Sequence, residues 1–110
     1  MNAGDVVWVD FGTPIGSEPG FRRPAVIITA DAVLRRAPRT IHIVPLTTNT
    51  TRAMPTEVPI TDAGLAATSS AQTHLCTVVS VQRLIDTSVT NVGPVDLARI
   101  RETLAELIDL

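Results

Sequence analysis

The chain has 110 residues, 45% of them hydrophobic, and a formal net charge of −2 at pH 7. This length suits one domain, residues 1–110, which buries about two thirds of the surface of its unfolded chain. The slight acidity excludes a general attraction to nucleic acid or anionic membranes. The single cysteine excludes an internal disulfide. No signal peptide and no apolar stretch of membrane-spanning length is found, which predicts a cytoplasmic protein without membrane contact.

The first half of the chain is predicted to form strands around a long loop. Residues 6–11 are rich in β-branched and aromatic side chains, which favours a first strand. Residues 12–21 contain three glycines and two prolines, which predicts an exposed loop, and such long loops are usually functional. Residues 23–29 follow as a strand buried on both faces, because residues 25–28 are all apolar. A helical turn is expected within 30–40.

Residues 41–47 are predicted to form the third strand. Pro45 lies inside it and cannot donate a sheet hydrogen bond, which predicts an edge or a bulge at that point. The following elements are expected in chain order: a polar loop at 48–55, a short strand at 57–60, a turn at 62–64, a strand at 74–81 and a helical turn at 80–84.

The last segment is predicted to be a helix. Asp96 precedes it and is expected to be its N-cap. One helix face carries the apolar residues Leu97, Ile100, Leu104, Leu107 and Ile108. This face is expected to cover a small curled sheet, so the predicted fold class is mostly β with a C-terminal helix.

Arg22 and Arg23 are adjacent at the point where the loop meets the buried strand. A guanidinium held at a strand end offers a planar set of donors that suits phosphate or carboxylate. The same two residues also fit a solvated loop, and these residues alone do not decide between the two interpretations.

Several common catalytic motifs are absent from the sequence. The two histidines are 32 positions apart, and neither has a Cys, His or acidic partner at metal-ligand spacing. Nucleotide-cradling glycine motifs and the Gly-x-Ser-x-Gly motif are missing. Three aromatic residues are too few for a base-stacking platform. We therefore expect any enzyme of this sequence to work without a metal and without a cofactor.

Four segments, in the same order, resemble the MazF/PemK family of toxin endoribonucleases, and together they cover nearly the whole chain. The segments are Gly4-Asp5-Val6-Val7-Trp8-Val9-Asp10-Phe11; Gly16-Ser17-Glu18 with Arg23-Pro24-Ala25-Val26-Ile27; Val44-Pro45-Leu46-Thr47-Thr48-Asn49; and Gln82-Arg83-Leu84 with Val92-Gly93 and the last helix. The second is the most specific of the four. Each is weak alone, but their order makes the resemblance strong.

This resemblance implies an SH3-like small β-barrel with a C-terminal helix, assembled as a homodimer. It also implies metal-independent cleavage of single-stranded RNA at short sequence motifs. In this reaction the 2′-hydroxyl attacks the adjacent phosphate and leaves a 2′,3′-cyclic phosphate and a 5′-hydroxyl. A cognate MazE-like antitoxin is expected to inhibit the activity.

By position, Arg23 matches the family's catalytic arginine and Thr47 its catalytic threonine. His74 stands where PemK-like members place an acid proposed as the general base, although an ordinary surface or core histidine on a strand is the interpretation favoured over this role. Other positions are expected to contact substrate: Ser17, Glu18, Arg22, Thr48, Arg52 and Gln72. The family's Gln-x-Arg-Thr pattern is missing here, so the resemblance does not transfer a cleavage motif.

Two other functions remain open from the sequence. One is a non-enzymatic toxin like the CcdB gyrase poisons, which act by protein binding. The other is a plain SH3-like binding module. The pairing of Arg23 with Thr47 argues against the gyrase poison, because a protein that binds gyrase does not need an arginine that faces phosphate.

Overall fold

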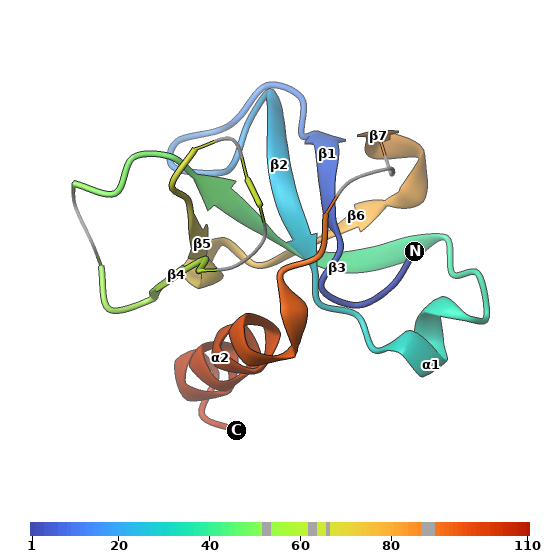
Figure 1. Ribbon diagram of the computed structural model, residues 1–110. Coiled ribbons are helices and arrows are strands. Elements are labelled where there is room, and N and C mark those ends of the chain that lie inside the picture. The colour runs from blue at the N-terminus through green and yellow to red at the C-terminus, as the bar shows by residue number, and fades with distance from the viewer. Residues whose placement is uncertain (52–53, 62–63, 66, 87–89) are drawn as a thin grey trace.

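The computed structural model describes residues 1–51, 54–61, 64–65, 67–86 and 90–110. It is built on a sheet of seven antiparallel strands flanked by helices α1 and α2 (Figure 1). The elements are β1 (Val6–Asp10), β2 (Arg22–Ile27), α1 (Asp31–Leu34), β3 (Thr40–Thr47), β4 (Glu57–Pro59), β5 (Ser70–Gln72), η1 (Thr73–Leu75), β6 (Thr77–Ser80), η2 (Val81–Arg83), β7 (Leu84–Asp86) and α2 (Gly93–Leu107). The turn expected at 62–64 lies mostly outside the described residues.

The longest strand, β3, lies inside the sheet and changes its neighbour halfway along. The strand order is β4-β5-β3-β2-β1-β7, and β6 also pairs with β3. The first half of β3 pairs with β6, and its last two residues, Leu46 and Thr47, pair with β5. Pro45 lies between these two stretches and faces Ala25 on the β2 side. Of the two predicted alternatives, an edge or a bulge, the edge is therefore wrong, and the missing N–H of Pro45 falls at a gap between two partners.

Both faces of the sheet are buried, because alternate residues of the central strands enter two separate cores. Val26 and Val44 belong to the core that α2 covers through Leu97 and Ile100. Ala25 and Ile27 belong to the other core, which α1 joins through Leu34. Residues 25–28 are all buried, which confirms the prediction of a strand buried on both sides.

Helix α2 begins four residues earlier than predicted. Its N-cap position is Val92, and Asn91 Oδ1 accepts a hydrogen bond from the N–H of Gly93 at 2.8 Å. Asp96 therefore lies inside the first turn and is not the N-cap. Leu104 is partly buried, whereas Leu107 is 43% and Ile108 57% exposed, so only the first half of the apolar face packs on the sheet.

The strand predicted at 74–81 is shorter than expected. Residues 73–75 form the 3-10 turn η1, and β6 begins at Thr77. The helical turn predicted at 80–84 is present as η2. Strands β5 and β7, each of three residues, were not predicted from the sequence.

The predicted fold class, mostly β with a C-terminal helix, is confirmed. Within the described residues the sheet is barrel-like but open, since no pairing joins its outer strands β4 and β7. None of the described helices is both long and apolar enough to span a membrane.

Candidate active site

Arg23 is held by neighbouring strands on one side of its guanidinium. It lies in β2 opposite Val9 of β1, and it is partly buried. Its Nη2 donates to the carbonyl oxygen of Leu46 at 2.9 Å and also to Oε1 of Gln72. Burial lowers the pKa of Arg23 from its usual value, because the charged form loses hydration. The resulting group is a fixed cation at the end of a rigid strand.

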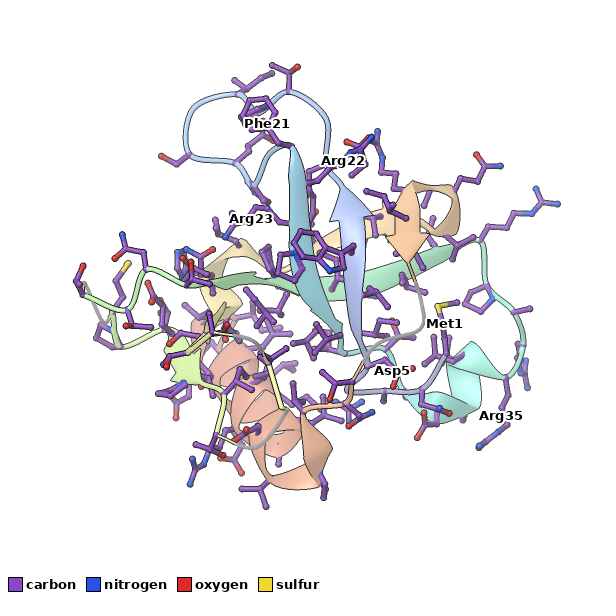
Figure 2. All side chains as sticks on the ribbon, turned by 45° about the horizontal axis from the view of Figure 1, so that its top comes forward. Met1, Asp5, Phe21, Arg22, Arg23 and Arg35 are labelled. Atoms are coloured by element: carbon purple, nitrogen blue, oxygen red, sulfur yellow. The ribbon has the colours of Figure 1, made fainter. Side chains whose placement is uncertain are left out.

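Arg22 and Arg23 do not form a pair in space. Successive side chains of a strand point to opposite faces, and Figure 2 shows the two arginines leaving β2 in opposite directions. Arg22 is exposed and lies opposite Asp10 of β1. The structure therefore brings only one of the two adjacent guanidiniums to the side of Gln72.

Thr47 is the last residue of β3 and is partly buried. The β2–β3 register, which pairs Ala25 with Pro45, sets Thr47 opposite Arg23 when it is continued by two residues. Thr47 Oγ1 accepts a hydrogen bond from the N–H of Asn49 at 3.1 Å. A hydroxyl that accepts still has its own hydrogen to donate, so Thr47 can donate to a ligand between the two strands. The next residue, Thr48, is exposed.

Gln72 and His74 differ in their relation to this arginine. Gln72 ends β5 and contacts Arg23 directly. His74 follows in η1, is exposed, and its Nδ1 lies 2.9 Å from Thr56 Oγ1. None of the hydrogen bonds among the described residues joins His74 to Arg23 or Thr47. Its other ring nitrogen, Nε2, forms no hydrogen bond in the same set.

Ser17 and Glu18 lie in the exposed loop between β1 and β2, at the top of Figure 1. Glu18 serves the loop itself, since its Oε1 accepts from the N–H of Ile15 at 2.9 Å. Arg52, the remaining predicted contact, lies outside the described residues.

Glu57 is a residue that the sequence analysis missed. It lies in β4 directly opposite Gln72 of β5. Its Oε2 is buried and has no hydrogen-bond partner among the described residues, which is uncommon for a carboxylate. The sequence holds no signal for this placement, because Glu57 reads there as an ordinary residue of a short strand.

A groove with a volume of about 370 Å³ opens on the face of β2 opposite to the side chain of Arg23. Trp8 and Pro24, which are cross-strand neighbours, line it together with Thr48 and Leu65. Trp8 is 42% exposed there. Pro24 and Thr48, which line the groove, directly follow Arg23 and Thr47 in the sequence. The groove therefore lies next to these two residues and presents an apolar surface on the opposite face of their strands.

The chemistry of this site is that of a cation and a hydroxyl. Among the described residues, no carboxylate forms an ion pair with Arg23. The ion pair found among them joins Arg99 to Asp96. Within the same residues, no group of three or more His, Cys, Asp or Glu side chains is placed to hold a metal ion. The arrangement is suited to binding an anion and to stabilising negative charge that develops on it.

The family model of the PemK-like, MazF-like toxins of type II toxin–antitoxin systems matches residues 2–108. The chain belongs to this family. A curated relative, Endoribonuclease MazF9 of Mycobacterium tuberculosis, is 30% identical and is covered over 98% of its length by 100% of this chain. The family predicted from the four sequence segments is thereby confirmed.

Two solved structures share the fold of this PemK/MazF toxin. The crystal structure of MazF from Deinococcus radiodurans superposes with a TM-score of 0.85 at 24% identity, with 100% of this chain and 97% of that chain covered. A mycobacterial endoribonuclease in complex with its cognate antitoxin gives a TM-score of 0.77 at 23% identity, with 100% and 96% covered. At this level of identity the two structures support the fold of the toxin and not its activity.

Proposed function

We propose that this PemK/MazF toxin is an endoribonuclease that cleaves single-stranded RNA, such as mRNA, at short sequence motifs. The observation that carries the proposal is the geometry of Arg23, a partly buried guanidinium anchored on Leu46 and Gln72 beside the hydroxyl of Thr47. A relative named as an endoribonuclease, MazF9, supports the same activity.

The proposed reaction is an internal transfer at phosphorus. The 2′-oxygen forms a bond to the phosphate, the bond from phosphorus to the 5′-oxygen breaks, and the products carry a 2′,3′-cyclic phosphate and a 5′-hydroxyl. Arg23 stabilises the extra negative charge on the phosphate oxygens in the transition state. Thr47 donates a hydrogen bond to the same phosphate or orients the 2′-hydroxyl.

One proton must leave the 2′-hydroxyl and one must reach the 5′-oxygen. Arg23 is a poor base, because a guanidinium stays protonated across the usual pH range. His74 is our candidate for the proton acceptor, since an imidazole changes its charge near neutral pH and its Nε2 forms no described hydrogen bond.

The partners we propose are a cognate MazE-like antitoxin, a second copy of the chain in a homodimer, and RNA. The mycobacterial endoribonuclease solved in complex with its cognate antitoxin supports the first of these. We also propose that residues 1–110 act as one toxin domain and that the protein works in the cytoplasm, where its mRNA substrate is found.

Cleavage of a single-stranded RNA by the purified protein in EDTA tests the activity. We expect cut RNA with 2′,3′-cyclic phosphate ends, detected by mass spectrometry. Intact RNA would contradict the proposed nuclease activity. The protein would then be a toxin that acts by protein binding, like the CcdB gyrase poisons, or a plain binding module.

Variants of the same protein test the site. We expect Arg23→Ala to lower kcat about 100-fold or more, as the loss of a transition-state donor does, and Thr47→Val to lower it about tenfold. Arg35→Ala is the matched control, because Arg35 is exposed and lies far from Arg23 in Figure 2. Full activity of Arg23→Ala would show that the site is wrong.

His74→Ala tests the proton acceptor separately. We expect a loss of about 100-fold in kcat together with loss of the acidic limb of the pH–rate profile. An unchanged rate and profile would return His74 to the role of an ordinary surface histidine.

A further inference from the structure

One of the two terminal nitrogens of the Arg23 guanidinium binds acceptors of the protein itself. A guanidinium has five N–H donors, two on each terminal nitrogen and one on Nε. Nη2 donates both to the carbonyl of Leu46 and to the side chain of Gln72. A guanidinium can hold an anion with two parallel N–H donors, either from Nη1 and Nη2 or from Nε and Nη2. Both pairs include Nη2, so neither pair is free for a ligand. The donors left for an anion are those of Nη1 and Nε.

Gln72 is the adjustable part of this anchor. The Leu46 acceptor is a backbone oxygen of β3, next to the β5 partner Ala71, and no substitution removes it. The Gln72 acceptor is a side-chain oxygen that comes from β5, one strand further away. Without it, one hydrogen of Nη2 is unpaired and the side chain of Arg23 can rotate about its last bonds.

We infer that Gln72 is a positioning residue, whose Oε1 fixes Nη2 of Arg23 so that the guanidinium meets the phosphate with a single free donor, on Nη1 or on Nε. The inference rests on the proposed function only for the identity of the anion. It replaces the direct substrate contact that the sequence predicts for Gln72 with an action through Arg23.

The side-chain ¹⁵N spectrum of arginine tests the anchor without any substrate. We expect resolved Nη1 and Nη2 signals for Arg23 in the wild-type protein, because an anchored guanidinium rotates slowly. Gln72→Met, which keeps the length of the side chain and removes the acceptor, is expected to merge them. Arg101, whose Nη2 donates to the carbonyl of Ile28 at 3.0 Å, is an internal reference that should not change. An Arg23→Lys sample assigns the signals.

Gln72→Glu keeps an acceptor oxygen at the same place, so the Arg23 signals are expected to stay resolved in this variant. If Gln72→Met does not fold, the Arg23 signals of Gln72→Glu test the anchor, and merged signals in that variant would contradict it. Merged signals in the wild-type protein, or resolved signals in folded Gln72→Met, would overturn the anchor.

Kinetics with a single-stranded RNA test the consequence. Gln72→Met is expected to lower kcat about 10- to 100-fold with little change in KM, because the lost interaction orients Arg23 in the transition state. In an Arg23→Ala background the same change is expected to cost nothing further, since the two residues act as a unit. The control is Gln82→Met, at an exposed glutamine in η2.

The outcomes separate this inference from the proposed function. A raised KM with unchanged kcat, or an equal loss in the Arg23→Ala background, would show that Gln72 contacts RNA by itself. If the wild-type protein does not cut RNA at all, the proposed function fails, and the arginine spectrum still decides whether Gln72 anchors Arg23.

Discussion

Asp96 shows how a single residue can have the expected chemistry in an unexpected place. Its carboxylate is 1% exposed and accepts hydrogen bonds from the N–H of Thr61 at 2.9 Å and from its hydroxyl at 3.1 and 3.2 Å. The sequence pattern predicted a cap for the helix itself. The structure instead shows a carboxylate that ties α2 to the chain that follows β4.

Asp96→Ala is expected to lower the free energy of unfolding by about 1–3 kcal/mol, because it removes a charged acceptor from the N–H and the hydroxyl of Thr61. Urea unfolding measures the change. Glu106→Ala, at an exposed position of the same helix, should stay within about 0.5 kcal/mol of the wild type. Equal stability of the two variants would mean that Asp96 does not hold the helix to the sheet.

Cys76 is a second residue whose chemistry depends on its burial. It is partly buried against the core that α2 covers, and burial raises the pKa of its thiol. A raised pKa leaves less thiolate at neutral pH, which fits a small core residue better than a nucleophile.

The loop between β1 and β2 is the element whose shape the sequence left open. Two backbone hydrogen bonds close its base, from Phe11 to Phe21 at 2.8 Å and from Phe21 to Gly12 at 2.7 Å. Phe21 has a φ of 58°, which is strained for a bulky residue. A Cβ at Gly20 would lie 2.4 Å from the ring of Pro14. These contacts pack the loop against itself directly before Arg22.

Gly20→Ala is expected to open this loop, because the new methyl group and Pro14 cannot occupy the same space. Trypsin should then cut the bond after Arg22 about tenfold faster than in the wild-type protein, since local opening exposes the chain. The bond after Arg23 precedes Pro24 and should stay intact. Ser17→Ala, at an exposed position of the same loop, is the control, and equal cutting of both variants would contradict the close packing at Gly20.

At the scale of the whole molecule, charge is unevenly distributed along an acidic chain. Residues 1–56 hold six of the nine arginines and four of the eleven acids. An RNA-binding surface on such a protein must rely on a few local arginines. Of those expected to contact RNA, Arg22 and Arg23 point in opposite directions (Figure 2), so few phosphates can be contacted at once.

A shallow salt dependence of RNA binding is therefore expected. Single-stranded nucleic acid gives a slope of about −0.7 in log Kobs against log salt for each phosphate contact. One to three contacts predict a slope between about −0.7 and −2. Fluorescence anisotropy with a 2′-deoxy analogue, which lacks the attacking hydroxyl, measures it between low and high salt. A slope steeper than about −4 would require a basic surface that these arginines do not supply.

The sequence by itself determined the family, the mostly β fold with a C-terminal helix, and the two strand ends that carry Arg23 and Thr47. The family follows from the resemblance of four short segments in the same order, and the fold follows from runs of β-branched residues, from glycine and proline at the turns, and from the helical spacing of leucine and isoleucine. Such patterns act over a few residues, so they can be read along the chain.

Only the tertiary structure decided which side chains meet. Gln72 lies on the three-residue strand β5, which no sequence pattern predicts, and Glu57 lies opposite it on the short strand β4. Arg22 and Arg23 are adjacent in sequence yet separated by the alternation of a strand. The contact of Arg23 with Gln72 spans 49 positions, and it exists because β2, β3 and β5 are neighbours in one sheet, a long-range pairing that no local pattern specifies.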